Sequence, residues 1–546
     1  MRHSLWSGIL LALVLLLAHE RSALSLGQPH TPGRASSTSK FTLSTWLDAN
    51  LVKVKSNNRG GLATNVGGGY GGGFWPDTLK ARQNVILFDF GPWVIGKVNG
   101  VPKMGLSQWG TSYSPGPAIN GQAAMVAMPL DSVRYRVYKI RQGDNATSNP
   151  DYRDWPVDLG APVDQQGKPR LLGDQMLWSV FNNIDPTAPS DWWQTHMPNP
   201  GLPVVIQQSV YARTVPGGDP SALLENVAFI EWTIINVGPN PIESTYVSLW
   251  TDIDFNDSQN NRPAIDTTNQ LGYCWQFRDD DYLKPPRAVG FVWLYGPSVP
   301  SPGDQSVFKG RERADSRNLP ITSFWGIQDD SFQDSSFRGP AYSMGTAWNI
   351  ARGFDKGGNP VLDSVTHQVT NFLYNGDPIT GTGWLCPSSS GGAGFNLFSG
   401  PFTLAPGDTQ WVMAALIPVS DTSRLQCVTL LREAAAKLRS ESYDSFIVTS
   451  ATPEANTLPL TVRLEQNYPN PFNPSTTIRF ALPHRSHILL AVYNALGQRV
   501  AELENGDMDA GFHEVQFEGR NLASGVYFYR LSTGSFVDTK RLILLK

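Results

Sequence analysis

The chain has 546 residues, with 51 glycines, 41 prolines and a formal net charge of −4 at pH 7. This length exceeds what one hydrophobic core usually serves, so we expect at least two domains. The charge leaves no basic excess, which argues against nucleic acid as a partner. The many glycines and prolines, with few charged residues, indicate a soluble all-β protein of short strands and tight turns.

The N-terminus predicts an export signal. A basic start precedes the apolar run from Ile9 to Ala18, and small residues up to Ser25 form a cleavage site. The run is shorter than the roughly 20 apolar residues that span a bilayer. We therefore predict a signal peptide at 1–25, a flexible segment at 26–45, and a protein that is not integral to the membrane.

Residues 46–448 form the predicted body, a large β-sandwich. Strand patterns such as "NVAFIEWTIINVG" (226–238) and "STYVSLWTDIDF" (244–255) are separated by turn signals. The segment "GPFTLAPGDTQWVMAALIPV" (400–419) reads as a strand, a turn and a strand. We expect it to pair with residues 226–254 as the closing hairpin of an immunoglobulin-like sandwich, with about 255–395 inserted between them. The insertion leaves open whether the body has one or two subdomains.

One helix is predicted near the end of the body. Asp421 or Ser423 is a plausible N-cap. Apolar residues follow at spacings of three and four, and they are Leu425, Val428, Leu431, Ala435 and Leu438. We expect this helix to pack on one edge of the body, before a Thr- and Pro-rich linker at 449–462.

Residues 463–546 predict a second, small β-sandwich. It begins with "NYPNPFNPST" (467–476), where the prolines fix φ and remove amide donors, so the segment reads as a stiff clasp. Asn470 and Asn473 are expected to hydrogen-bond local backbone amides as Asx turns. Alternating apolar residues then follow from Ile478 onward.

Five ordered blocks of this segment carry a resemblance to a known family. They are "NYPNPFNPST", "VYNALGQRV", "GFHEVQFEG", "NLASGVYFYRL" and the terminal "TKRLILLK". Residues 463–546 resemble the type A C-terminal sorting domain of type IX secretion substrates, found in Bacteroidetes and related bacteria. The resemblance implies export to the periplasm, recognition of residues 463–546 by the type IX machinery, and passage to the cell surface or the medium. An ordinary accessory domain without this role is the alternative, and cleavage of the domain stays open.

The body also resembles a set of secreted proteins that carry the same sorting domain. The similarity covers most of residues 65–440 and includes "GPWVIGKVNG", "SLWTDIDF" and "SGPFTLAPGDTQ". It implies no catalytic residues and no substrate.

The body shows no short catalytic motif. We find no H-E-x-x-H, G-x-S-x-G or P-loop. A glycosidase with paired carboxylates has no such motif and stays open. Glu231 lies inside the apolar stretch "FIEWTII", and alternation predicts that it faces solvent while Ile230, Trp232 and Ile234 face inward.

The stretch "TDIDFNDSQNNRPAID" suggests a metal site. Carboxylate and amide oxygens at close spacing suit calcium. The candidate ligands are Asp252, Asp254, Asn256, Asp257 and Asp266. The spacing does not fit an EF-hand, and a solvated acidic turn is the alternative.

The sequence leaves open the bonding state of the cysteines and the role of one tryptophan pair. Cys274, Cys386 and Cys427 allow one disulfide and one thiol, or three buried thiols, and the pairing is undetermined. The pair Trp192 and Trp193 suggests either a sugar-stacking surface or core packing, and core packing is favoured for the tryptophans of the body.

We therefore expect a cell-surface protein that acts by binding, adhesion or surface assembly. A carbohydrate-active hydrolase with Asp or Glu catalysts is the rival hypothesis. Binding of a surface glycan or protein, and association with further copies of the chain, are both open, and calcium is the only cofactor suggested.

Overall fold

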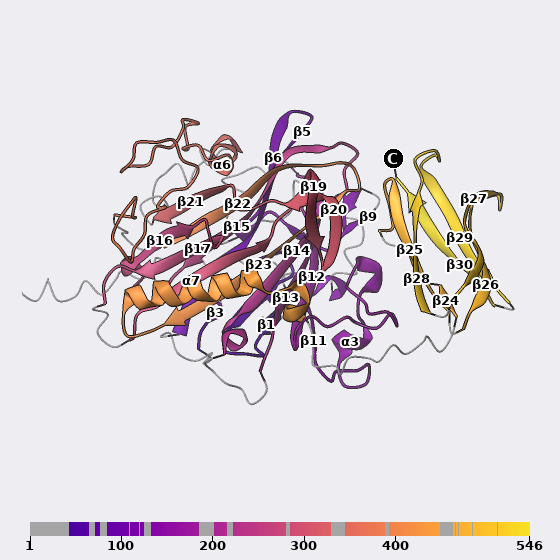
Figure 1. The fold of residues 1–546 in the computed structure, drawn as a ribbon, viewed down its shortest axis with the longest axis horizontal. Helices are drawn as coiled ribbons and strands as arrows, with labels where there is room; N and C mark the ends of the chain where they lie inside the picture. Colours follow the sequence, from indigo (N-terminus) through magenta and orange to yellow (C-terminus); the bar gives the residue numbers. More distant parts are fainter. Residues whose placement is uncertain are drawn as a thin grey trace, which may run out of the picture.

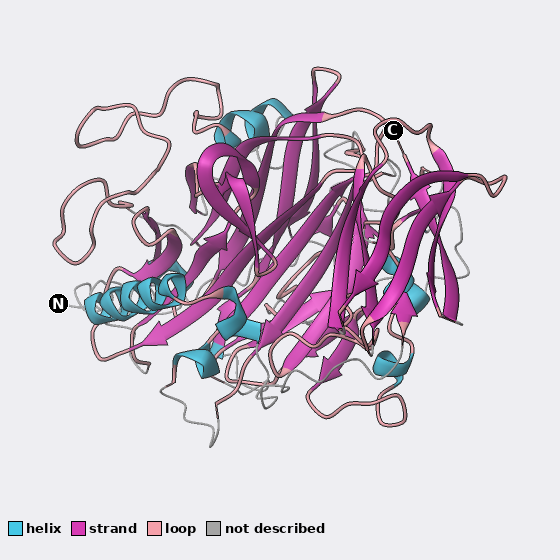
Figure 2. Cartoon of the chain, turned by 45° about the vertical axis from the view of Figure 1, so that its right-hand side comes forward, coloured by secondary structure: helices cyan, strands magenta, loops and turns pink. Residues whose placement is uncertain are grey.

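The computed structural model describes most of the chain in detail. The described residues are 43–64, 71–76, 84–108, 110–119, 121–124, 133–184, 201–215, 222–279, 284–328, 344–387, 393–447, 462–464, 466–467, 469–482, 484–509, 511–534 and 536–545. Strands dominate them, and the helices lie at the margins (Figure 2).

Two large antiparallel sheets make up the body (Figure 1). One sheet has nine strands: β11 (Tyr138–Arg141), β12 (Gln175–Asn182), β13 (Val204–Ala212), β14 (Ala228–Asn236), β23 (Thr409–Ser420), β18 (Arg287–Tyr295), β17 (Leu271–Gln276) and β16 (Asn261–Asp266), with β8 (Ser114–Pro115) beside β12. The other has six strands: β21 (Ser323–Gln328), β22 (Ala393–Leu404), β15 (Ile242–Ile253), β5 (Asp89–Val98), β6 (Val101–Gln108) and β7 (Gly110–Thr111).

Smaller elements extend the two sheets. A four-stranded sheet is formed by β1 (Ser44–Leu47), β2 (Lys53–Asn57), β3 (Gly73–Phe74) and β4 (Val85–Leu87). The short strands β9 (Ala118–Ile119) and β10 (Gln122–Ala123) pair with each other. The long strands β19 (Ser298–Phe308) and β20 (Arg311–Asn318) form a separate hairpin whose residues are mostly exposed.

The two strands predicted at 400–419 lie beside residues 226–254 as expected, but they belong to different sheets and do not form a hairpin, because the turn between them crosses from one layer to the other. Strand β22 pairs with β15, and β23 pairs with β14, both antiparallel. The inserted residues add β16, β17 and β18 to the nine-stranded sheet and β21 to the six-stranded sheet. The insertion is therefore part of the same sandwich and extends both of its layers.

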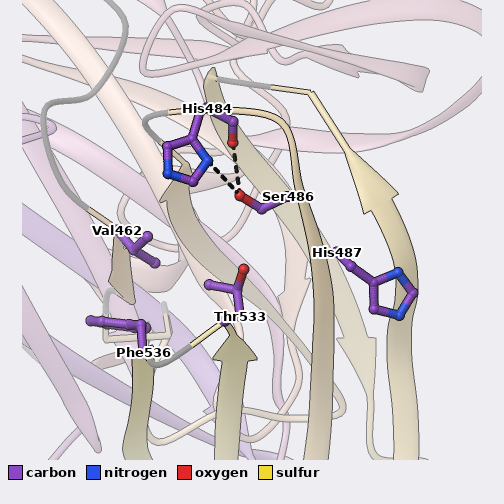
Figure 3. Close-up of a pocket in the computed structure, with 7 residues that line it drawn as sticks. Val462, His484, Ser486, His487, Thr533 and Phe536 are labelled. Carbon is purple, nitrogen blue, oxygen red and sulfur yellow. Dashed lines mark hydrogen bonds between the residues drawn. The ribbon is translucent and has the colours of Figure 1, made fainter.

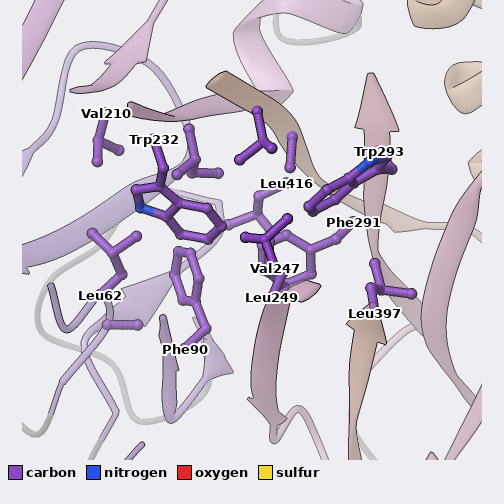
Figure 4. Close-up of a cluster of buried hydrophobic side chains, with 14 of the residues drawn as sticks. Leu62, Phe90, Val210, Trp232, Val247, Leu249, Phe291, Trp293, Leu397 and Leu416 are labelled. Atoms are coloured by element: carbon purple, nitrogen blue, oxygen red, sulfur yellow. The ribbon is translucent and has the colours of Figure 1, made fainter. Parts of the chain in front are cut away.

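The main core lies between the two sheets (Figure 4). The side chains that fill it come from both layers and include Leu62, Phe90, Trp232, Leu249, Phe291 and Leu416. Among the described residues, six tryptophans are fully buried, namely Trp93, Trp178, Trp232, Trp250, Trp293 and Trp411. These indoles are core, as the sequence favoured.

The predicted helix is α7 (Arg424–Ser440), which begins after Ser423 as expected. It packs on the outer face of the nine-stranded sheet together with α8 (Tyr443–Ile447), and their apolar side chains complete a second core there. A further helix, α6 (Met344–Ala351), covers the outer face of the six-stranded sheet, and α3 (Pro150–Arg153) lies beside β11. Because helices lie on both outer faces, the central strands are buried on both sides.

The C-terminal module is a small two-sheet sandwich with its own core. One sheet contains β24 (Arg463–Leu464), β25 (Ser475–Leu482) and β28 (Gly511–Glu518). The other contains β27 (Arg499–Met508), β26 (Ser486–Tyr493), β29 (Gly525–Thr533) and β30 (Phe536–Leu544). No strand pairing among the described residues joins the module to the body. The all-β class and the sandwich layers are thus as predicted.

Three predictions concern segments outside the described residues. These are the signal peptide at 1–25, most of the segment at 26–45, and nearly all of the linker at 449–462. Trp192 and Trp193 also lie outside them.

Candidate functional site

The proline-rich clasp of the C-terminal module holds the last strand of the chain. The Phe472 amide donates to the Ile543 carbonyl at 2.9 Å, and the Leu545 amide donates to the Phe472 carbonyl at 3.0 Å. The side chain of Asn470 accepts from the Ile543 amide at 2.8 Å and donates to the Arg541 carbonyl at 3.1 Å. Asn470 thus supplies through its side chain the strand contacts that the neighbouring prolines, having no N–H, cannot make.

A second asparagine organises the start of the clasp. Buried Asn467 donates from its backbone to the Tyr529 hydroxyl at 2.7 Å and from its side chain to the Thr476 hydroxyl at 2.9 Å. The Phe472 ring is 1% exposed and packs 5.8 Å from the Phe517 ring in the module core. The clasp is therefore anchored at both ends.

The expected role of the two clasp asparagines is corrected in part. Asn470 bonds to β30 instead of to local backbone amides. Asn473 donates to the Pro406 carbonyl of the body at 2.7 Å. The prolines of this segment have no backbone N–H to donate, so the side chains of both asparagines bond to other segments.

Glu231 is buried, so the prediction that it faces solvent is wrong. Its side chain is 3% exposed, and it lies on the face of β14 that α7 and α8 cover. Ile230, Trp232 and Ile234 face the main core, as predicted. The prediction failed because the outer face of the nine-stranded sheet packs against a second hydrophobic core and is not exposed to solvent.

Three donors surround the Glu231 carboxylate. One oxygen accepts from the hydroxyls of Tyr211 at 2.9 Å and Tyr443 at 3.0 Å, and the other accepts from Trp411 Nε1 at 2.9 Å. Burial, with the Glu231 charge beside them, raises the pKa of both tyrosines well above its usual value, so the hydroxyls remain donors. This cluster joins β13, β14, β23 and α8.

The tip of the β19–β20 hairpin reaches the same cluster. Gly310 approaches Tyr443 so closely that an added Cβ would lie 2.7 Å from the ring. Burial lowers the pKa of Lys309 beside it, while the Glu231 carboxylate opposes that shift. All three hydrogen-bond donors to the Glu231 carboxylate are side chains of the protein. This arrangement suits a structural role, in which Glu231 holds neighbouring elements together, better than the role of a catalytic base.

The outer face of the six-stranded sheet carries a pair of buried aspartates. Asp252 on β15 lies directly opposite Asp89 on β5, and both side chains are buried. Directly opposed residues in an antiparallel ladder have Cα atoms about 4.5–5.5 Å apart, and their side chains share a face. In the adjacent row, Trp250 lies opposite Asn396.

Asn396 adds a buried polar group to this face. Its Oδ1 accepts from the Ser248 hydroxyl at 3.1 Å, and its Nδ2 has no hydrogen-bond partner within the described part of the chain. Two acids and an amide therefore gather where sequence reasoning singled out Asp252 alone. Asp89 was missed because strand register across so long a sequence separation is not visible in local patterns.

The predicted calcium ligands are divided by the fold. Asp254, Asn256 and Asp257 lie in the turn between β15 and β16, and Asp252 lies one residue before the end of β15. Asp266 ends β16, about 17 Å along the strand from its start at Asn261. The structure does not bring Asp266 to the other four residues.

The turn residues have protein partners. Asn256 donates to the Gln276 side chain at 3.0 Å, and Asp257 accepts from the Gln259 amide at 3.1 Å. Asp266 lies 3.3 Å from the Arg432 guanidinium of α7. Within the described ranges, no group of three or more His, Cys, Asp or Glu residues is arranged to hold a metal ion. Calcium at Asp252, Asp254, Asn256 and Asp257 stays a prediction.

The three cysteines are buried free thiols. Cys274 lies on β17 and Cys427 on α7, while Cys386 lies in the segment before β22. Burial raises the pKa of the Cys427 thiol to about 12, so it stays protonated and unreactive at neutral pH.

Comparison with known families decides the identity of the C-terminal module. Residues 466–545 match the family model of the secretion system C-terminal sorting domain. The chain ends in a type IX sorting domain. Its presence indicates engagement with the type IX machinery and export to the cell surface or the extracellular space.

Other comparisons say little about the body. No curated protein matches the chain in sequence. Among solved structures, a polysaccharide lyase aligns with 11% identity and a TM-score of 0.19, covering 81% of this chain and 47% of the lyase. Latent PorU from Porphyromonas gingivalis aligns with 12% identity and a TM-score of 0.14, covering 63% of this chain and 32% of PorU. The chain thus spans about half the length of the lyase, and likeness at this level supports no functional argument.

The sorting domain contains a hollow where the linker enters (Figure 3). Its volume is about 430 Å³, and its lining is Val462, His484, Ser486, His487, Thr533, Gly534 and Phe536. The Ser486 hydroxyl lies 2.9 Å from His484 Nδ1, whereas the His487 ring lies 3.0 Å from the Asp507 carboxylate. The Ser486 hydroxyl also donates to the His484 carbonyl oxygen at 3.0 Å, and no acid in this lining contacts His484 to orient it as a base.

The described helices include none with the length and apolar composition that a membrane crossing requires.

Proposed function

We propose that the body is a binding module that the sorting domain delivers to the cell surface, where it acts in adhesion or as part of a surface layer. The signal peptide expected at 1–25 would start this route. The observation that carries the proposal is an exposed apolar ridge, formed by Leu362, Val365 and Val369. These side chains are 54%, 56% and 65% exposed.

The ridge is held in a defined shape. Leu362 and Val369 are paired across an antiparallel bridge, so their side chains share a face. Asp363 accepts from the amides of Val365 and Thr366 at 2.8 and 2.9 Å, which fixes the turn between them. Ile379, in the next turn, is 38% exposed. Exposed aliphatic residues grouped in one ordered segment are typical of contact surfaces.

The test uses the full-length protein and cells that secrete it. The variant L362S/V365S/V369S removes the ridge, and V101S/V133S removes two valines of similar exposure elsewhere on the body. We expect the ridge variant to lose binding to immobilised cell-surface polysaccharide or to neighbouring cells, and the control to keep it. Equal binding by the two variants would contradict the proposal.

A second candidate function is a carbohydrate-active hydrolase. The opposed aspartates Asp89 and Asp252 favour it, because their side chains share one face of the sheet and retaining glycosidases use two carboxylates set close together. In such a reaction one carboxylate would attack the anomeric carbon and the other would protonate the leaving oxygen. The buried Asn396 amide on the same face suits a sugar hydroxyl.

Turnover distinguishes the two functions. The purified protein is incubated with polysaccharides, and new reducing ends are measured. Activity that is lost in D89N and in D252N but kept in D257N would establish the hydrolase and end the binding-only proposal. Binding without turnover supports the surface-binding function.

A further inference from the structure

One face of the sorting domain points away from the body. The body touches the opposite side of the sandwich, where Arg311 of the β19–β20 hairpin lies 3.2 Å from Glu514 on β28. Figure 1 shows β25 and β28 on the side of the body and β26, β29 and β30 on the far side. We call the far surface of β26, β29 and β30 the distal face. Because the body does not cover it, this face remains accessible while the cargo is attached.

The distal face combines apolar and aromatic side chains with two arginines. Strand register places Tyr493 opposite Phe528, and Phe528 opposite Arg541. Val526 lies opposite Ile543 at the end of the same face. Val526 is 42% exposed and Val537 is 60% exposed. A solvent-facing sheet surface more often carries polar side chains, so this composition indicates a contact surface.

Two arginines on the distal face have no acidic partner within the described part of the chain. Between residues 479 and 541 the sorting domain has six arginines, and four of them form ion pairs, namely Arg479, Arg485, Arg499 and Arg520. Arg530 and Arg541 form none among the described residues, and both are exposed. The two lie diagonally across β29 and β30, at a Cα separation of about 7–8 Å.

Local contacts hold one of these arginines in place. The Arg530 guanidinium lies 5.2 Å from the centre of the Tyr493 ring, and its Nε donates to the Thr539 hydroxyl at 3.2 Å. The remaining guanidinium N–H groups form no ion pair with a carboxylate of the described residues. An oriented guanidinium on an aromatic ring, with its charge uncompensated, suits recognition of a carboxylate on a partner protein.

We propose that the distal face is the surface by which an acidic protein of the secretion machinery recognises the sorting domain. Arg530 and Arg541 bind carboxylates of that protein, and Tyr493, Phe528 and Val526 form the apolar contact between them. This inference rests on the sorting role of residues 466–545 and is independent of the proposed activity of the body.

Charge reversal in a secreting cell tests the proposal. The full-length variant R530E/R541E is compared with R520E, which changes an arginine of 70% side-chain exposure outside the distal face. We measure the fraction of protein in the periplasm, on the cell surface and in the medium. We expect secretion of R530E/R541E to fall about tenfold or more, with periplasmic accumulation, and R520E to be secreted as the parent chain is.

Further variants exclude loss of folding as the cause. R530A/R541A removes both charges at exposed strand positions without introducing repulsion, and R530K/R541K keeps the charges. We expect the alanine pair to accumulate in the periplasm with an unchanged thermal unfolding profile, and the lysine pair to retain part of its secretion. Normal secretion of the alanine pair would overturn the proposal. If the alanine pair crossed the outer membrane normally but was released into the medium, the proposal would also be overturned. The distal face would then serve attachment to a surface glycolipid and not recognition by the machinery.

Discussion

Replacing Glu231 by glutamine should destabilise the body strongly. The carboxylate accepts three hydrogen bonds in a site that is 3% exposed. Trp411 Nε1 can only donate, so the amide must turn its oxygen to the indole and its NH₂ group to the two tyrosines. The hydroxyl protons of Tyr211 and Tyr443 then lose their acceptor. A buried donor without a partner costs about 1–3 kcal/mol, so we expect E231Q to lose about 2–6 kcal/mol of unfolding free energy.

Urea unfolding followed by tryptophan fluorescence measures this loss. Residues 463–546 contain no tryptophan, so the signal reports the body alone. The matched control is E243Q, which makes the same change at an exposed position on β15 and should cost about 0.5 kcal/mol or less. If E231Q proved no less stable than E243Q, Glu231 would not lock the helices and the hairpin tip onto the sheet.

Three further predictions concern other contacts. Burial acts to raise the pKa of Asp48, but Lys139 and its other partners outweigh it and hold the pKa below 3.8. D48N should therefore cost about 1 kcal/mol at neutral pH, and the difference in urea midpoint from the parent chain should vanish as pH falls through the folded-state pKa; a constant difference would contradict this. N470A should speed amide exchange at Ile543 about tenfold or more, and N473A, whose side chain contacts the body, should not; equal effects would contradict the clasp assignment. If the acidic turn binds calcium, chelation should lower the unfolding midpoint of the parent chain and not of D257N; an unchanged parent midpoint would remove the site.

Local patterns predicted the framework of the body well. The two strands at 400–419 were expected beside residues 226–254, and β22 pairs with β15 and β23 with β14, although the two lie in different sheets and form no hairpin. Helix α7 begins after Ser423, and its apolar spacing predicted it because that spacing is a local feature; the Ser423 side chain makes no capping hydrogen bond. Period-two alternation likewise identified the inward residues of the sorting domain, such as Ile478 and Phe480.

The sites depended on information that local patterns do not contain. Glu231 was placed in solvent because alternation reveals two faces of a strand but not what covers each one. The stretch around it holds apolar residues on both faces, including Phe229, and this continuous run was the available sign of a strand buried on both sides. The opposition of Asp89 and Asp252, and the distance of Asp266 from the acidic turn, follow from the register and direction of strands far apart in sequence.

The sorting domain folds separately from the body, and deletion of residues 463–546 tests this separation. The domain has its own core, and among the described residues it contacts the body through Arg311 with Glu514 and Asn473 with Pro406. A chain lacking residues 463–546 should keep the unfolding midpoint of the body and accumulate in the periplasm. Residues 449–546 fused to a periplasmic reporter should carry it to the cell surface. Delivery of the truncated body to the surface at the level of the full chain would contradict the account.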